Sequence, residues 1–469
     1  MSSLVALGAG ELAARLRSGE LGALEVLEAH LAALDRVDPL LRAGVARMEA
    51  DARRAARAAE RALASGGEVG PLCGVPFSIN DAFDTAGTAT TAGSRLYASR
   101  IPERDAIAVE RMRAAGAIPL VKSNLPEFGL HYDCGNPLFG ETRNPWDPAR
   151  TPGGSCGGEA ALLAARLSPL GLGKDAAGSI RVPSHFCGTV GLMPTPGRIP
   201  LPGLFPDAIR QYVVNGVMAR SCDDAWLGLG ALSGYDPRDP LTHDAPLRDP
   251  GSADPRALRV ALGNPGPTRA SRAVQARVEA AARALEAAGL AVEEAEPPAA
   301  REAQEVFWPI LLQEGAYYAD SAIPADRYAE VDPEWRERRD AMRSAAIDAR
   351  QLTEARFRRL ELQAQGREWM EAHPVLLAPC YVTTAFRRGE RELDVDGERL
   401  PMLSGGAPAT WANFMALPSL VVPAGLASDG LPVGVQLVGR PFREHELVAV
   451  GRLLEQALGG CRVPPISAL

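Results

Sequence analysis

The sequence predicts an α/β fold in a single large domain, and two patterns indicate it. Short apolar runs typical of buried strands alternate with segments that carry Leu, Ala and Val at helical spacing. The helix expected over 106–116 leads directly into a strand expected over 118–122, which is the order of a strand–helix–strand unit. The chain has no internal repeat, low-complexity tract or obvious linker, so one domain spanning 1–469 is expected.

The N-terminal part, residues 1–70, is predicted to consist of helices. Leucines recur at helical spacing over 9–36, where Gly19 and Gly22 separate two helices. Residues 47–65 are rich in Ala, Arg and Glu and predict a third helix. We interpret these helices as packing elements and not as a site.

Residues 71–200 are the predicted catalytic core. Residues 74–84 form a short apolar strand that ends in polar residues, where α/β folds often place chemistry. Residues 300–370 are helical, charged and aromatic-bearing, so 300–400 is expected to form a variable wall or lid of a substrate pocket. Further elements are expected as a helix over 271–288, a strand over 290–293, strands over 375–379, 418–425 and 433–439, and a helix over 444–458.

Composition and charge exclude several classes of protein. The net charge of −8 argues against nucleic acid or an anionic membrane surface as a partner, because either would favour a basic face. The seven cysteines are odd in number and scattered, which suits a reducing cytoplasm. No basic N-terminal region or long apolar run is present, so no signal peptide or membrane span is expected. The six histidines are too dispersed for a metal site, and neither a metal nor an organic cofactor is predicted.

Two serines in small-residue turns are the candidate chemistry. Ser155 lies among glycines, and Ser179 follows Gly178, so hydroxyl and backbone N–H groups can approach a substrate closely. The letters around Ser155 fit a nucleophile elbow, but the proline-rich segment 144–152 before it predicts a loop and not a strand. Residues 171–176 match a loose dinucleotide fingerprint without a clean strand–turn–helix around it. Taken alone, both stretches could equally be tight turns.

A resemblance to a known family decides between these interpretations. Gly153-Gly-Ser155-Cys-Gly-Gly158 and Asp175-Ala-Ala-Gly-Ser179-Ile-Arg181 resemble the two loops of the amidase signature family. Pieces around Gly74, over 122–128, over 186–191 and over 431–436 resemble the family in the same order. The resemblance implies a mixed, twisted sheet sandwiched between helices.

The family works through a Ser-cis-Ser-Lys triad, which the resemblance carries over by position. Ser179 matches the nucleophile, which forms an acyl-enzyme that water hydrolyses, and Ser155 matches the bridging serine that relays the proton. The backbone N–H groups of Ala176, Ala177, Gly178 and Ser179 would form the oxyanion hole, where each good donor contributes about 10²–10³ in rate.

The position of the general-base lysine is occupied by Asn80. An amide cannot accept a proton at useful pH, so Asn80 cannot be the base. Three explanations remain open. The first is that the residue has been changed from Lys. The second is that the base has moved to Lys174, because desolvation of a buried lysine can remove its proton, although Asp175 beside it would keep a lysine charged. The third is that hydrolysis has been lost and the pocket retained for binding or acyl transfer.

Smaller departures indicate specialisation. Cys156 replaces a serine and is interpreted as a packed small residue rather than a second nucleophile. Ala177 replaces a glycine and calls for a negative φ. His131, Asp133 and Cys134 lie in a stretch that lines the pocket in the family, and are predicted to contact the substrate.

The predicted function is therefore an amide hydrolase or acyl-transfer enzyme acting on a small to medium carboxamide, as a monomer or homodimer in the cytoplasm. The alternatives are an impaired, amide-binding family member and a glutamine-dependent amidotransferase-type subunit that works with partner chains.

Overall fold

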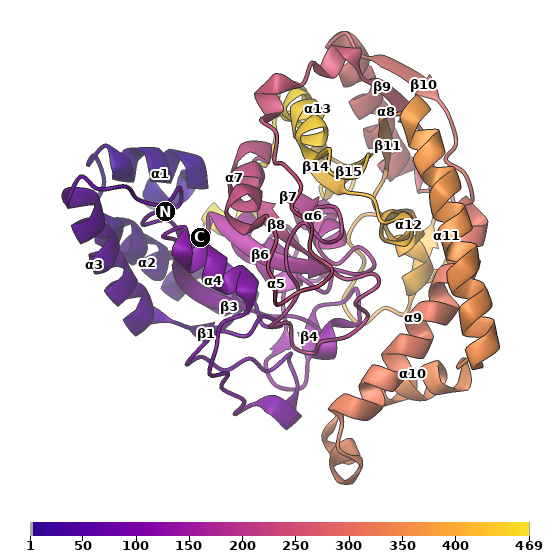
Figure 1. The fold of residues 1–469 in the computed structure, drawn as a ribbon, viewed down its shortest axis with the longest axis horizontal. Helices are drawn as coiled ribbons and strands as arrows, with labels where there is room; N and C mark the ends of the chain where they lie inside the picture. The colour runs from indigo at the N-terminus through magenta and orange to yellow at the C-terminus, as the bar shows by residue number, and fades with distance from the viewer. Residues whose placement is uncertain (1–2, 469) are drawn as a thin grey trace.

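A mixed sheet of eleven strands organises the computed structural model, which describes residues 3–468 (Figure 1). The strand order is β1-β3-β2-β6-β8-β7-β14-β15-β11-β9-β10. The runs β3-β2-β6 and β11-β9-β10 are parallel, and the other neighbours are antiparallel. The strands are β1 (Gly44–Arg47), β2 (Pro76–Asn80), β3 (Ile118–Ser123), β6 (Leu170–Asp175), β7 (Val190–Met193), β8 (Val214–Ala219), β9 (Arg259–Leu262), β10 (Ala291–Glu294), β11 (Val375–Pro379), β14 (Ser419–Leu426) and β15 (Pro432–Gly439).

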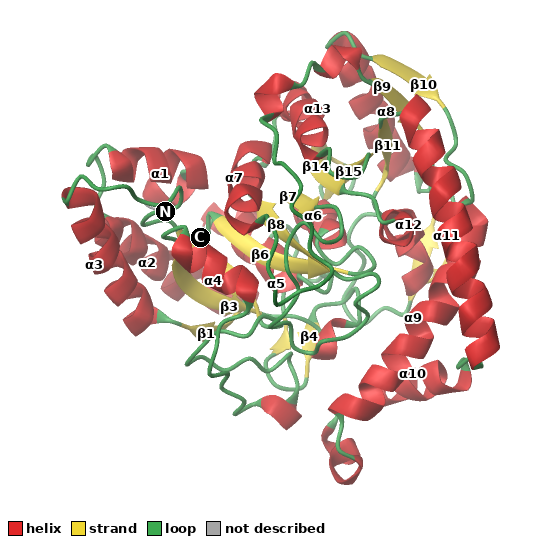
Figure 2. Cartoon of the chain, viewed as in Figure 1, coloured by secondary structure: helices red, strands yellow, loops and turns green. Residues whose placement is uncertain are grey.

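Helices flank this sheet, as the red and yellow elements of Figure 2 show. One layer is continuous, because α7 contacts α4 and α13, and α13 contacts α8, while α5 and α6 contact each other and the central strands. The helices are α1 (Ala9–Arg17), α2 (Ala23–Leu41), α3 (Glu49–Ala64), α4 (Ile107–Ala114), α5 (Gly157–Ala164), α6 (Arg181–Cys187), α7 (Cys222–Leu232), α8 (Arg272–Ala287), α9 (Ala300–Ala322), α10 (Pro333–Ser344), α11 (Ala349–Ala372), α12 (Ala407–Met415) and α13 (Glu444–Leu458). Two small hairpins, β4 (Gly135–Asn136) with β5 (Gly140–Glu141) and β12 (Glu392–Val395) with β13 (Glu398–Pro401), lie outside the sheet.

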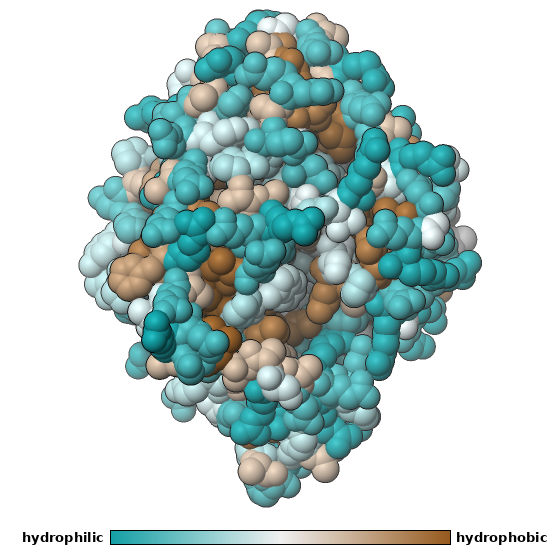
Figure 3. All heavy atoms as spheres, turned by 90° about the vertical axis from the view of Figure 1, so that its right-hand side faces the viewer, coloured by the Kyte–Doolittle hydropathy of each residue, from teal (hydrophilic) through white to brown (hydrophobic). Residues whose placement is uncertain are grey.

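The two ends of the molecule differ in how they pack. Helices α1 to α3 gather beside β1 and β3 at the N-terminal end, whereas α9 to α11 form a long helical edge on the opposite side (Figure 1). The face that carries this edge is mainly hydrophilic, with separate apolar patches (Figure 3). No helix among residues 3–468 has the length and apolar character that crossing a bilayer requires.

Single-domain α/β architecture, predicted from the order of the elements, is confirmed, and so is the mixed sheet that the resemblance implied. The start and end of α8 follow local rules, since the Ser271 side chain caps its N-terminus and Gly289, at φ +92°, ends it.

Three central strands, β6, β8 and β7, were not predicted. Strand β6 reads Leu-Gly-Leu-Gly-Lys-Asp, so two glycines and two charged residues hide the apolar pattern of a strand. It forms because β2 and β8 pair with it on both sides. The expectation that no strand–turn–helix surrounds 171–176 is therefore wrong: β6, the Ser179 loop and α6 follow one another directly.

Candidate functional site

The two serine loops meet at the centre of the molecule. Ser155 immediately precedes α5, and the peptide bond between Gly154 and Ser155 is cis. Ser179 lies in the loop between β6 and α6. The loops are joined because the Cys156 N–H donates a hydrogen bond to the Ser179 carbonyl oxygen at 3.1 Å.

A buried ion pair holds the Ser179 loop in place. The Asp175 carboxylate accepts from Arg181 Nε at 2.9 Å, from the Gly178 N–H at 2.7 Å and from the Ile180 N–H at 3.1 Å. Burial alone would raise the pKa of Asp175, but the Arg181 charge and these hydrogen bonds lower it below its usual value. Gly178 has φ +103°, a conformation that a side chain would strain. Arg181 therefore has a structural role, since it holds the Asp175 carboxylate on which the loop depends.

The predicted oxyanion donors divide into two groups. Gly178 donates its N–H to Asp175, so it is not free to face a substrate oxygen. The N–H groups of Ala176, Ala177 and Ser179 have no acceptor within residues 3–468. Ala177 keeps a negative φ, and its carbonyl oxygen accepts from the Tyr132 hydroxyl. Three backbone donors of this loop remain open to a ligand.

Asn80 ends β2 in a fully buried position. Its Oδ1 accepts from the Ala82 N–H at 3.2 Å, while its Nδ2 has no acceptor within the described residues. The Ser155 hydroxyl is also fully buried and has no partner there. Buried polar atoms without hydrogen-bond partners are uncommon and costly, so Asn80 Nδ2 and Ser155 Oγ mark a region where the fold leaves hydrogen-bonding groups unpaired.

Lys174, on β6, projects into the same region. It lines a small cavity of about 30 Å³ together with Ser179 and Gly129. A Cβ atom on Gly129 would lie 2.8 Å from Lys174 Nζ and 3.6 Å from Ser155 Oγ. The ammonium group and the Ser155 hydroxyl therefore share the space that the missing side chain of Gly129, at φ +71°, leaves open.

No carboxylate accompanies the Lys174 ammonium group in the described chain. Burial lowers the pKa of Lys174, and the nearby Cys156 thiol opposes this. The expectation that Asp175 keeps Lys174 charged is wrong, because successive side chains of a strand point to opposite faces and the Asp175 carboxylate is engaged by Arg181.

An apolar cavity of about 350 Å³ opens beside the Ser179 loop. Ala176, Ala177 and Ser179 lie on one side of it. Its other walls come mainly from α9 and α10, within the segment predicted to form a pocket wall or lid: Trp308, Leu311, Leu312, Gly315, Arg338, Ala341 and Met342. The arrangement can hold an apolar group next to a serine hydroxyl and open N–H donors.

The three predicted contact residues of the 129–134 loop have different positions. His131 lines the apolar cavity and a second, polar cavity, and burial lowers the pKa of its imidazole to about 3, so the ring is neutral. Asp133 lines only the polar cavity. Cys134 is fully buried, lines neither, and packs against Gly157, where an added Cβ would lie 2.6 Å from Cys134 Cβ. The predicted contact of Cys134 with substrate is therefore wrong, because α5 covers it.

Cys156 is fully buried, and burial raises the pKa of its thiol to about 12, so it remains a protonated packing residue.

Sequence reasoning missed Gly129, Tyr132 and Arg338. Gly129 and Tyr132 adjoin His131, but no pattern in the sequence distinguishes them, and Arg338 comes from a distant helix.

Comparison with known proteins gives consistent results. The family described as Amidase matches residues 25–448. A glutamyl-tRNA(Gln) amidotransferase subunit of Anaeromyxobacter sp. (strain K) is 36% identical, over 98% of this chain and 98% of the relative.

Solved structures are similar over the whole chain. The structure of 6-aminohexanoate cyclic dimer hydrolase complexed with substrate is 30% identical, with a TM-score of 0.88 over 99% of each chain. A bacterial aryl acylamidase of the amidase signature family is 28% identical, with a TM-score of 0.89 over 98% of each chain.

Proposed function

The chain belongs to the amidase family, whose signature enzymes hydrolyse amides, and on that premise we propose that it hydrolyses a small to medium carboxamide through a Ser179 acyl-enzyme, with Lys174 as the relocated base. One observation carries the proposal: the partly buried Lys174 ammonium group has no carboxylate partner in the described chain and faces the gap at Gly129 that the Ser155 hydroxyl also faces. Asn80 then needs no basic function.

The proposed reaction uses the three side chains in sequence. Neutral Lys174 Nζ accepts the proton of Ser155 Oγ, which accepts that of Ser179 Oγ as this oxygen attacks the amide carbonyl carbon. The N–H groups of Ala176, Ala177 and Ser179 stabilise the oxyanion. The carbon–nitrogen bond breaks as the amine takes the proton back through Ser155. Water then attacks the ester, which releases the acid and regenerates the Ser179 hydroxyl.

The substrate class is supported by the cavity. Its walls are almost entirely apolar, which favours an alkyl or aryl group attached to the amide. The similarity to an aryl acylamidase supports the same class. The seven cysteines are free thiols, which supports the cytoplasm as the compartment.

A mass-spectrometric experiment tests the proposal. A fluorophosphonate should add to Ser179 in the natural protein, and an anilide of an apolar acid should give aniline and acid. Lys174→Met should slow both reactions, whereas Glu398→Gln, an exposed change on β13, should leave both unchanged. An unlabelled Ser179 with no anilide turnover would favour a protein that only binds amides. Activity that appears only after Asn80→Lys would favour a lysine lost from position 80.

An amidotransferase-type subunit is the second candidate. It is supported by the identity to a glutamyl-tRNA(Gln) amidotransferase subunit over nearly the whole chain. This candidate requires glutamine as the amide and predicts glutamine hydrolysis that increases with partner chains. The purified chain should instead prefer apolar anilides, because the cavity beside Ser179 offers a glutamine backbone few polar partners.

A further inference from the structure

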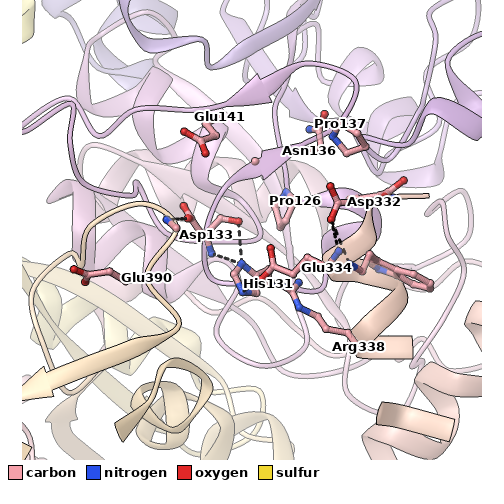
Figure 4. A pocket seen from close by; sticks show the side chains of 14 residues that line it. Pro126, His131, Asp133, Asn136, Pro137, Glu141, Asp332, Glu334, Arg338 and Glu390 are labelled. Atoms are coloured by element: carbon pink, nitrogen blue, oxygen red, sulfur yellow. Dashed lines mark hydrogen bonds and ion pairs between the residues drawn. The ribbon is translucent and has the colours of Figure 1, made fainter. Parts of the chain in front are cut away.

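A second cavity, of about 230 Å³, lies beyond the 129–134 loop (Figure 4). It shares His131 and Arg338 with the apolar cavity beside Ser179, so the two spaces adjoin at these side chains. Figure 4 shows the carboxylates of Asp133, Glu141 and Glu390 on one side of this cavity and those of Asp332 and Glu334 on the other.

The lining of the second cavity is strongly acidic. Six carboxylates contribute to it: Glu127, Asp133, Glu141, Asp332, Glu334 and Glu390. Arg338 is the charged cation of the lining, and its Nη2 is paired with Glu334 at 2.6 Å. His131 is neutral, since its pKa is lowered to about 3. Glu141 is paired with Arg388.

The other four carboxylates, Glu127, Asp133, Asp332 and Glu390, have no ion pair within residues 3–468. Burial raises the pKa of Glu127 and of Asp133, and a cation in this cavity would oppose that effect and favour the charged carboxylates.

Glu127 points independently to a missing ligand. The residue is only 4% exposed. Its Oε2 accepts from the Asp332 N–H at 3.0 Å, which fixes the carboxylate, but its Oε1 is buried and has no hydrogen-bond donor in the described chain. Burial raises the pKa of Glu127, and the nearby Ser94 hydroxyl opposes this effect without reaching hydrogen-bond geometry.

Asp133 repeats this arrangement across the cavity. Its Oδ2 accepts from the Gly389 N–H at 2.8 Å, and its buried Oδ1 has no donor in that part of the chain. In both residues the backbone anchors one oxygen and leaves the other available. Trp335 also lines the cavity, and its ring packs edge-on against Phe128.

We propose that this cavity is a subsite for a cationic group of the substrate, an alkylammonium or guanidinium, which an apolar segment joins to the amide at Ser179. The inference rests on the proposed amide hydrolysis and names its substrate class. The apolar cavity holds the connecting segment, and the free oxygens of Glu127 and Asp133 accept hydrogen bonds from the cation. An organic cation fits better than a metal ion, because residues 3–468 contain no His, Cys, Asp and Glu group arranged to hold a metal.

Two matched pairs of amides test the subsite. One pair carries the charge on the acyl side, ε-aminocaproyl anilide against caproyl anilide. The other carries it on the amine side, the caproyl amide of cadaverine against N-pentylcaproamide. The cationic member of at least one pair should have the higher kcat/KM, by about 30-fold or more, as expected for a partly buried charge pair. Equal kcat/KM values within both pairs would contradict the proposed cation subsite without contradicting the proposed amide hydrolysis.

Variants locate the effect in the cavity. Glu127→Gln removes the charge but keeps an oxygen that can accept from the Asp332 N–H, so the loop should remain folded. It should reduce the preference for the cationic amide over the neutral amide about 30-fold. Glu398→Gln removes an exposed carboxylate elsewhere and should change neither rate. A Glu127→Gln enzyme that retains the full preference would contradict the proposal.

Calorimetry on Ser179→Ala separates the subsite from the reaction. This variant should bind the cationic member of the pair that shows the preference more tightly than its neutral match, and the difference should disappear in the Ser179→Ala/Glu127→Gln double variant. Preferential binding without turnover of any amide in the natural protein would keep the subsite and reject hydrolysis. Equal binding of the cationic and neutral members in both pairs, with no preference in turnover, would reject the subsite.

Discussion

Lys122 and Lys174 lie in the same sheet, two strands apart, yet their surroundings are opposite: Lys122 is fully buried, whereas Lys174 is only partly buried. Lys122, on β3, donates to Thr90 Oγ1 at 3.0 Å and to the Phe83 carbonyl oxygen, and lies 3.4 Å from Asp81 Oδ1. Lys174, on β6, has no such acceptor in the described chain and lines a cavity with Ser179.

The difference teaches that burial alone does not make a lysine a base. Desolvation lowers the pKa of both ammonium groups. The Asp81 charge opposes it at Lys122, whereas at Lys174 only a cysteine does. An ammonium group surrounded by acceptors keeps its proton and holds loops together, while one without acceptors can release its proton to a reaction.

Replacement of Lys174 has the largest expected effect. Lys174→Met should lower kcat/KM for an anilide by about 10²–10⁴, the usual loss when a positioned base is removed. The melting temperature should change little, because no ion pair or hydrogen bond is lost. Turnover and calorimetry check the two expectations, and unchanged turnover would place the base elsewhere.

The same change at Lys122 should affect stability. Lys122→Met leaves the Asp81 carboxylate buried and unpaired, so the free energy of unfolding should fall by about 3–5 kcal/mol in urea titrations. Asp81→Asn in the same chain should recover part of that loss. A Lys122→Met protein as stable as the natural one would remove the contrast between the two lysines.

Moving the lysine from position 174 to position 80 tests directly whether the base has been relocated. In Lys174→Met, the second change Asn80→Lys returns an ammonium group to the place that the family resemblance assigns to it, and should recover about tenfold or more in kcat. Asn80→Gln in the same background is the matched control and should recover nothing. If both double variants stay equally slow, position 80 no longer reaches the site.

The pH dependence should give the smallest but most specific effect. In the proposed mechanism the neutral form of Lys174 is the base, so kcat/KM should fall as pH decreases through a pKa that lies below the value of about 10.4 for a free lysine. Because the folded pKa is lowered, the unfolded chain binds more protons, and stability should also rise with pH between the folded and unfolded pKa values. In Lys174→Met, pre-steady-state rates should no longer fall as pH decreases through this pKa.

Local sequence rules account for much of the fold. The apolar periodicity of 9–36 and the cap and stop of the helix over 272–287 depend only on neighbours in the chain, so they could be predicted. Strand β6 could not, since its glycines and charged residues are tolerated only where two strands pair with it.

The sequence by itself determined that two serine loops resemble those of amidases, and the same resemblance predicts Asn80 at the position of the family's base. Only the tertiary structure decided which way Lys174 and Asp175 point, because adjacent side chains of a strand face opposite sides and their partners are distant in sequence. It also assembled the acidic cavity from segments around 127–141, 332–338 and 389–390. Charge in such a cavity depends on contacts between residues more than 200 positions apart, which local patterns do not encode.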